Sequence, residues 1–375
     1  MQRFDVKVRG SGVVGRTLAL ALSRLGLSVA LSGEGPARAP REDVRAYALN
    51  AASIALFRSL KVWDALPADA RTAVHDMRVR GDADDAALEF SSWDQRVGAL
   101  AVITDAAALE DELSTALRFA PHVTHLASGD AADRNADAAL VAHCEGRPSP
   151  SQPSPDSGYE ISDYGQRAIA ARLVASRPHG HVARQWFCSP DVLALLPFDR
   201  PTAGRSYGLV WSLPSERADR LLALPANAFE NELGLATGGD AGTLQLAGER
   251  AAWPLAVGRA ERWCGPGWVL LGDAAHVVHP LAGQGLNLGL ADVAALVATI
   301  AAREPWRPLG DERLLRRYVR QLAAPTWAML RMTDGLQRLF AHESAPVREL
   351  RNNGLVLVDR LGPLKRWLTA RALDS

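Results

Sequence analysis

A glycine-rich hexapeptide near the N-terminus has the residue types and spacing that bind a phosphate group. Residues 10–15 read GSGVVG, a GxGxxG pattern between a short apolar run and a helical apolar pattern. In a strand–turn–helix unit, Gly10 makes the tight turn, Gly12 lets a pyrophosphate approach the backbone, and Gly15 lets helix and strand pack closely. The helix dipole and the first-turn amides then favour the phosphate charge. The alternative is an ordinary glycine-rich turn, because the hexapeptide alone is a weak signal in a chain with 31 glycines.

A dinucleotide site of this type also uses an acidic residue at the end of the second strand. That residue lies about 18 positions beyond the third glycine and holds a ribose hydroxyl. Here the position is occupied by Gly33, and Glu34 follows one place late. Two interpretations stay open: Glu34 takes the ribose after an adjustment of the turn, or it is a solvated loop carboxylate.

A second polar loop follows a buried strand pattern in the last third of the chain. Residues 268–276 read WVLLGDAAH, and residues 279–289 read HPLAGQGLNLG. Asp273 at the strand's end is placed to accept hydrogen bonds from the ribityl hydroxyls of a flavin. Residues 283–287 open a helix and offer backbone N–H groups to the electron-rich pyrimidine edge of a reduced flavin.

Two histidines in this loop raise the question of a metal site. His276 and His279 are three residues apart, but the sequence shows no third cluster of ligands for them. A structural or catalytic metal needs at least three protein ligands. We therefore expect these histidines to pack in the loop near the flavin, and we expect no metal.

The two motifs together resemble the FAD fingerprints of the aromatic-ring flavin monooxygenases with the p-hydroxybenzoate hydroxylase fold. More narrowly, they resemble the ubiquinone-biosynthesis hydroxylases of bacteria and mitochondria. The resemblance extends to residues 43–49 (DVRAYAL), in which the family's arginine, here Arg45, lies over the flavin and the pyrophosphate. It implies cofactor contacts at residues from all of these motifs: Gly10, Gly12, Val14, Gly15, Glu34, Arg45, Asp273, Pro280, Gly283, Gly285, Leu286 and Asn287.

The resemblance implies an FAD-dependent monooxygenase that hydroxylates the aromatic ring of a polyprenylated ubiquinone precursor with NAD(P)H and O2. The flavin carries this chemistry, so no catalytic side chain is nominated. Two alternatives stay open. One is a flavin monooxygenase for another aromatic substrate, and the other is a non-catalytic scaffold member of a ubiquinone-synthesis complex.

One motif departs from the family pattern. Members carry a D-G pair followed by a Ser and an Arg, which touch the flavin and the nicotinamide donor. Residues 144–149 read CEGRPS here, so Glu145 and Gly146 stand for the pair and the expected downstream Arg is absent. This departure keeps the scaffold alternative open, because NAD(P)H-dependent turnover is less secure without that arginine, whereas the other two motifs still predict FAD binding.

The elements that position these motifs follow from periodicity. The strand–turn–helix–strand opening is typical of a doubly wound α/β domain. Residues 50–66 and 105–119 have helical patterns, whereas residues 74–100 and four runs between 169 and 213 indicate strands. From residue 286 the pattern is mostly helical, with Pro325 among the prolines that should interrupt it.

We therefore predict an α/β fold in which a Rossmann-like FAD-binding domain contains an inserted β-sheet substrate domain and ends in a helical C-terminus. The expected segments are residues 1–73, 98–165 and 259–320 for the FAD-binding domain, 74–97 and 166–258 for the substrate domain, and 321–375 for the C-terminal helices.

Composition limits the partners and the location. The chain has 42 Lys+Arg and 42 Asp+Glu, which argues against a nucleic-acid partner because such a partner needs a basic excess. Three cysteines without a CxxC pair fit a reducing cytosol, and no signal peptide is visible.

The longest uncharged apolar run, 293–302, is about half of a bilayer span. We expect a cytoplasmic protein. Apolar and basic residues interleave over 350–373, which suits peripheral contact at the inner face of the membrane or, alternatively, plain packing with a solvated basic face.

Overall fold

The chain opens with the strand–turn–helix–strand unit that the glycine pattern predicts. Strand β1 (Arg3–Arg9) leads into helix α1 (Val13–Arg24), and β2 (Val29–Gly33) pairs with β1 in parallel. Leu18 and Leu22, one helical turn apart on α1, are fully buried in the core that α1 shares with this sheet. The computed structural model describes residues 3–33, 43–81, 87–147, 157–278 and 285–341.

A six-stranded sheet organises the first region of the molecule. Its strand order is β15-β16-β9-β1-β2-β8, and all neighbours are parallel except β15 and β16. The carboxyl ends of β1, β9 and β16 therefore meet at one edge, where ligands bind in open α/β sheets. The strands not yet bounded are β8 (Val123–Ala127), β9 (Asp137–His143), β15 (Cys264–Gly265) and β16 (Trp268–Leu270).

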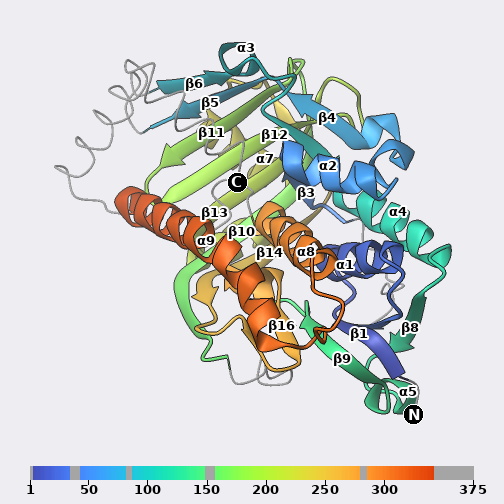
Figure 1. Ribbon diagram of the computed structural model, residues 1–375. Coiled ribbons are helices and arrows are strands. Elements are labelled where there is room, and N and C mark those ends of the chain that lie inside the picture. The colour runs from blue at the N-terminus through green and yellow to red at the C-terminus, as the bar shows by residue number, and fades with distance from the viewer. Residues whose placement is uncertain (1–2, 34–42, 82–86, 148–156, 279–284, 342–375) are drawn as a thin grey trace.

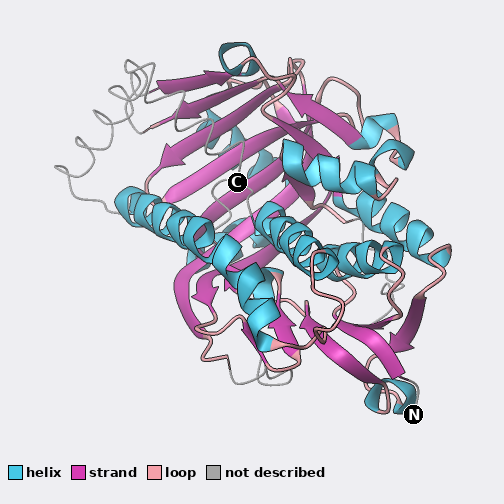
Figure 2. Cartoon of the chain, in the orientation of Figure 1, coloured by secondary structure: helices cyan, strands magenta, loops and turns pink. Residues whose placement is uncertain are grey.

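An eight-stranded sheet forms the second region, with the order β17-β14-β10-β13-β12-β11-β5-β6. Figure 2 shows its strands side by side across the molecule. All of its pairs are antiparallel except β11 with β5. Its strands are β5 (Asp76–Arg80), β6 (Ala87–Ser91), β10 (Glu160–Ala175), β11 (Val182–Cys188), β12 (Asp191–Phe198), β13 (Ser206–Pro214), β14 (Leu244–Arg259) and β17 (His276–Val277).

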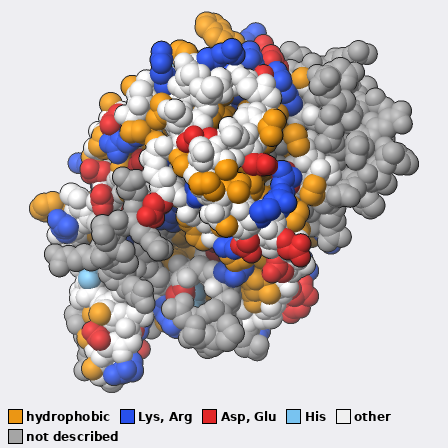
Figure 3. All heavy atoms as spheres, turned by 180° about the vertical axis from the view of Figure 1, so that it is seen from behind, with side chains coloured by type: hydrophobic (Ala, Val, Ile, Leu, Met, Phe, Trp, Pro, Cys, Tyr) orange, Lys and Arg blue, Asp and Glu red, His pale blue; other side chains and the backbone are white. Residues whose placement is uncertain are grey.

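The two faces of this large sheet have different partners. Helices α6 (Ser215–Ala223) and α7 (Ala226–Thr237) cover one face, where Trp211 and Phe229 lie in one buried cluster. The opposite face lies against β3, because a Cβ at Gly208 would be only 3.2 Å from the Cβ of Ala46. In the view from behind, basic, acidic and apolar side chains all appear on the surface (Figure 3).

A three-stranded sheet, ordered β3-β7-β4, joins the two regions. Its strands are β3 (Ala46–Leu49), β4 (Arg71–Val74) and β7 (Ala101–Asp105). The helical elements of this half of the chain are α2 (Ala51–Ser59), η1 (Trp63–Ala65), η2 (Ala68–Ala70), α3 (Ser92–Gln95), α4 (Ala106–Arg118) and α5 (Ala131–Arg134). Among them, α3 lies beside β6 and α5 beside β8.

The helix predicted for residues 50–66 is shorter than expected. It ends at Ser59, and Lys61 adopts the left-handed region with φ +57°. The turn lets Val62 and Trp63 both enter the core, which a continuous helix would not allow. Tertiary burial of these two side chains therefore overrides the helical periodicity.

The last described part of the chain is helical. After η3 (Gly272–Ala274) come α8 (Gly285–Ala301) and α9 (Glu312–Ala341), which crosses the front of the molecule in Figure 1. Pro325 lies inside α9 and does not interrupt it, contrary to the prediction. Gln321, whose carbonyl loses its donor to the proline, is exposed, so water can satisfy it.

The mixed α/β fold with a Rossmann-like parallel sheet and a second, β-rich region is confirmed. The exact boundaries expected for the domains remain a prediction. No helix among the described residues is both long and apolar enough to cross a membrane. The stretch 350–373 lies outside the residues that the structure describes.

Candidate functional site

Two glycines of the hexapeptide are required by the backbone itself. Gly10 has φ +104°, and a Cβ there would lie 2.3 Å from the carbonyl oxygen of Cys144 at the end of β9. A Cβ at Gly15 would lie 1.9 Å from the carbonyl oxygen of Gly10. Both distances are far below van der Waals contact, so β1, β9 and α1 can approach this closely only with glycine at both positions.

Gly12 differs from its two neighbours in the motif. It is the N-cap of α1 with φ −74°, and no atom of the described residues lies within 4 Å of the position that its Cβ would take. No side chain caps the helix, and its first turn contains no acidic residue. The amides of this turn therefore face open space that a phosphate can enter.

Val14 connects the hexapeptide to the second motif by packing. A Cβ at Gly289 would lie 2.8 Å from a Val14 methyl carbon, and a Cβ at Gly272 would lie 3.4 Å from it. Glycine at position 289 thus lets α8 approach α1. The structure gives Val14 a role in protein packing, and its contact with a cofactor remains a prediction.

Asp273 lies in η3, directly after β16 and at the carboxyl edge of the six-stranded sheet. Its side chain is exposed, yet desolvation by the surrounding protein raises its pKa, against the opposing charges of His276 and Arg147. The hydroxyl of Tyr159 donates a hydrogen bond to the Asp273 carbonyl oxygen at 3.0 Å, which fixes the backbone of the turn.

A buried ion pair, His276 with Asp292, holds the turn that carries Asp273. The Oδ2 atom of Asp292 accepts the backbone N–H of Gly272 at 2.7 Å and lies 2.8 Å from Nε2 of His276. Burial alone would lower the pKa of His276, but the Asp292 carboxylate outweighs it and raises that pKa. Asp292 was not among the predicted site residues, although it stands only three residues after the second motif. The ring of His276 also lies 5.1 Å from that of Trp263, so the histidine packs within the loop.

The described residues hold no group of three His, Cys, Asp or Glu side chains that could bind a metal. At the start of α8, the Asn287 side chain accepts hydrogen bonds from the Asn50 N–H (3.1 Å) and the Ser53 hydroxyl (2.8 Å), and it donates to the Ala48 carbonyl oxygen (2.8 Å). These contacts tie α8 to β3 and α2 and place its first residues, Gly285 and Leu286, at the same edge. The predicted site residues Glu34, Pro280 and Gly283 lie outside the described residues.

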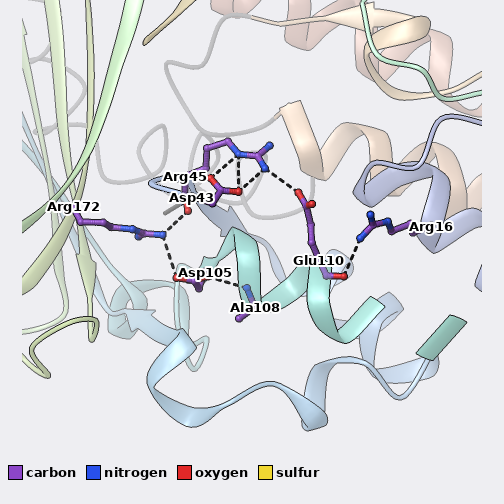
Figure 4. Close-up of polar contacts among 7 residues, drawn as sticks. All are labelled: Arg16, Asp43, Arg45, Asp105, Ala108, Glu110 and Arg172. Carbon is purple, nitrogen blue, oxygen red and sulfur yellow. Dashed lines mark hydrogen bonds and ion pairs between the residues drawn. The ribbon is translucent and has the colours of Figure 1, made fainter. Parts of the chain in front are cut away.

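Arg45 lies just before β3 in a network of charges (Figure 4). Its Nε atom donates to Asp43 at 2.9 Å, and its Nη2 atom lies 3.0 Å from the Glu110 carboxylate on α4. Burial would raise the pKa of Asp43, but the hydrogen bonds from Arg45 lower it overall. These bonds in turn raise the pKa of Arg45, which stays protonated.

Arg172 joins the large sheet to this network and was not foreseen. It comes from β10, donates to the Arg45 carbonyl oxygen, and lies 3.3 Å from the carboxylate of Asp105. Its guanidinium lies 4.0 Å from the ring centroid of Phe198. Desolvation lowers the pKa of Arg172. Nothing in the sequence marked it, because a single arginine in a strand pattern is usually a surface residue.

The altered middle motif lies beside the hexapeptide. Glu145 forms an ion pair with Arg9 at 2.8 Å and lies 3.4 Å from Nδ1 of His143. A Cβ at Gly10 would be 2.7 Å from the backbone nitrogen of Glu145, so this segment abuts the glycine turn. The Glu145 carboxylate is thus held by Arg9 and His143 at the edge of the site.

The residues present fit a flavin dinucleotide. Gly12 leaves the start of α1 open to a pyrophosphate, and Asp273 presents an exposed carboxylate to hydroxyl groups at the same sheet edge. The chemistry of this donor set is that of binding and orientation. The set contains amides, a carboxylate and a guanidinium, but no nucleophile paired with a base.

Sequence comparison extends this picture over the whole chain. The FAD binding domain family matches residues 3–333. The ubiquinone hydroxylase UbiL of Rhodospirillum rubrum is 33% identical over 99% of this chain and 90% of its own length. The 3-demethoxyubiquinol 3-hydroxylase of Escherichia coli is 30% identical over 99% of both chains.

A structural comparison agrees on the fold. The structure of Pseudomonas aeruginosa PqsL in complex with 2-aminobenzoylacetate has a TM-score of 0.74 to this chain. It covers 95% of this chain and all of that one, at 20% identity. The likeness therefore extends to both the six-stranded and the eight-stranded sheet. At this identity it shows the fold alone.

Proposed function

From the chain's membership of the FAD binding domain family of flavin-dependent monooxygenases, we propose that it hydroxylates the aromatic ring of a prenylated ubiquinone precursor with NAD(P)H and O2. The observation that carries this substrate is the extent of the likeness to ubiquinone hydroxylases. It runs over 99% of the chain and so includes the large sheet as well as the cofactor motifs.

When bound, FAD supplies the redox chemistry: it accepts a hydride from NAD(P)H and activates O2 for transfer to the ring. The protein's own residues bind the cofactor and orient it. Amides at the start of α1, open above Gly12, would hold the pyrophosphate, and Asp273 would accept hydrogen bonds from ribityl hydroxyls. The His276–Asp292 pair would keep the Asp273 turn in place.

The aromatic ring would lie under the inner face of the large sheet. Ala168 pairs with Ser212, Ala170 with Val210, and Arg172 with Gly208. These residues share one face, and Arg172 places that face against the segment of Arg45. Most of these side chains are short and apolar, so this face would exclude water from a ring bound against it.

A genetic experiment tests the substrate. Expression of this chain in a host that lacks one ubiquinone hydroxylase should restore ubiquinone, and the precursor lacking one ring hydroxyl should disappear. If a folded, flavin-loaded protein fails in every single-hydroxylase mutant, the substrate is another aromatic compound or the protein is a scaffold. An Asp273→Ala variant serves as the matched control, since it should fail wherever the wild-type chain succeeds.

The domain assignment belongs to the same proposal. Residues 1–73, 98–165 and 259–320 would bind FAD, and residues 74–97 and 166–258 would cover the substrate. The start of β10 pairs with the end of β14, Glu160 with Arg259, close to the expected boundaries at 165/166 and 258/259, which supports this assignment. Residues 321–375 would form a C-terminal helical region, of which α9 is the described part.

We further propose peripheral contact with the inner face of the cytoplasmic membrane. The exposed side of α9 carries four arginines and a tryptophan at helical spacing: Arg313, Arg316, Arg320, Trp327 and Arg331. Such a face suits anionic lipid, because arginine is attracted to the headgroups and tryptophan prefers the interface. Flotation should show binding to anionic but not to neutral vesicles. Binding to neither, with co-purification of other ubiquinone-synthesis proteins, would instead assign this surface to a complex.

A further inference from the structure

The guanidinium of Arg45 is shared between two carboxylates of different origin. Asp43 is its neighbour in sequence and accepts hydrogen bonds from both the Nε and Nη2 atoms. Glu110 comes from helix α4 and has one contact, 3.0 Å from Nη2 (Figure 4). One cation therefore faces two anions, and the cluster of three side chains carries a net charge of −1 when all are ionised.

This cluster is fixed beside the helix that would receive the pyrophosphate. Arg16 directly follows Gly15 and lies in the first turn of α1. Its Nη1 atom donates to the Glu110 carbonyl oxygen at 3.0 Å and to the Ser114 hydroxyl at 2.7 Å. Arg16 thus holds the backbone of Glu110 beside the first turn of α1.

The electrostatics of this arrangement oppose an incoming dianion. A pyrophosphate at the start of α1 would lie near the Glu110 carboxylate, and Arg45 is already paired with two carboxylates. The Glu110 contact is the one that can be exchanged. It is a single hydrogen bond, and both side chains are partly exposed (41% for Arg45 and 27% for Glu110), whereas the Asp43 contact is bidentate and local.

We propose that Glu110 is an internal competitor of FAD for Arg45. Without the cofactor, the Glu110 carboxylate is bonded to the Arg45 guanidinium. When FAD binds, the guanidinium turns from Glu110 to the pyrophosphate, while its hydrogen bonds to Asp43 remain. Glu110 thereby sets the affinity for FAD below the value that α1 and Arg45 would give alone. The inference rests on the proposed binding of FAD at α1.

Glu110→Gln tests this directly, because it removes the charge and keeps the shape of the side chain. The affinity of the apoprotein for FAD should rise about tenfold, the effect of removing one close unit charge in a partly solvated site. Riboflavin, which lacks the pyrophosphate, should bind the variant and the wild type equally. Quenching of flavin fluorescence measures both affinities, and Glu110→Ala should also tighten FAD if the glutamine variant folds poorly.

Asp111→Asn is the matched control. Asp111 is the next residue on α4 and is exposed, and its side chain makes no ion pair or hydrogen bond with the described residues. The Asp111→Asn variant changes the net charge by the same amount as Glu110→Gln, and it should leave the affinity for FAD unchanged.

Equal or weaker FAD binding by both Glu110 variants would overturn the proposal, and weaker binding would mean that Glu110 orients Arg45 for the cofactor. An equal gain in riboflavin affinity would also overturn it, since the pyrophosphate would then play no part. If folded wild-type and Asp111→Asn proteins bind no FAD at all, it is the proposed cofactor function that fails, and this inference with it.

Discussion

The Nε2 atom of His276 lies 2.8 Å from Oδ2 of Asp292, and both side chains are almost completely buried. The same Oδ2 atom accepts the backbone N–H of Gly272. A single carboxylate from α8 thus joins the loop histidine to the turn that carries Asp273. The turn's position depends on a charge pair that water does not reach.

The pair should make stability depend on pH. Because the fold raises the pKa of His276 above its ordinary 6.5, the stabilisation is complete below that pH and is lost as pH rises through the folded value. Asp292→Asn should cost about 3–5 kcal/mol, since it leaves a buried partner uncompensated. Urea unfolding across a pH series measures both effects. Equal unfolding free energies for variant and wild type would show that the pair contributes nothing.

The hexapeptide should separate cofactor binding from folding. Gly12→Val should fold normally, because no described atom lies near its Cβ, but it should lose FAD because the valine fills the approach of the pyrophosphate. Gly15→Ala should unfold or fold poorly, because its Cβ meets the Gly10 carbonyl oxygen. Circular dichroism and flavin content distinguish the two losses. A folded Gly12→Val protein with normal FAD content would contradict the site.

Asp273 should show opposite effects on stability and on binding. Its pKa is raised by desolvation, so its ionised form costs stability at neutral pH, and Asp273→Ala should raise the melting temperature of the apoprotein. The same change should weaken FAD by about 1.5–3 kcal/mol, since a charged acceptor of ribityl hydrogen bonds is lost. Thermal melts with and without FAD give both values. Unchanged FAD affinity would show that the carboxylate faces no cofactor.

The link between the two sheets should depend on Arg172. Arg172→Gln should destabilise the protein by about 3–5 kcal/mol, because the Asp105 carboxylate and the Arg45 carbonyl lose a buried cationic donor. Arg167→Gln on the same strand is the control, and its partly exposed pair with Asp219 should be worth at most about 1 kcal/mol. Chemical unfolding compares the two. A loss no larger for Arg172 than for Arg167 would rule out the link.

Local sterics explain which site features were predictable. The requirement for glycine at positions 10 and 15 arises within a strand–turn–helix unit, so the spacing alone predicts it. Asp273 was recognised because it stands at a strand's end inside a long motif. Both cases depend on contacts or patterns that are short in sequence.

The partners of these residues were not predictable in the same way. Glu110 meets Arg45 across 65 positions, and Arg172 reaches the Arg45 carbonyl across 127. In sequence, each of these is a single charged residue in an amphipathic pattern and is indistinguishable from a solvated one. The end of α2 at Ser59 and the uninterrupted α9 at Pro325 were also not predictable from local sequence. Tertiary burial determines the first, and solvent exposure of the free carbonyl allows the second.

The most direct test of the central claim is to follow oxygen itself. Purified, FAD-loaded protein is incubated with NAD(P)H, isotopically labelled O2 and a short-tailed prenylphenol precursor, and the product is analysed by mass spectrometry. The account predicts NAD(P)H oxidation that the precursor stimulates, and a product that has gained one hydroxyl carrying the label. A flavin-loaded protein that forms no labelled product with any ubiquinone precursor would contradict it.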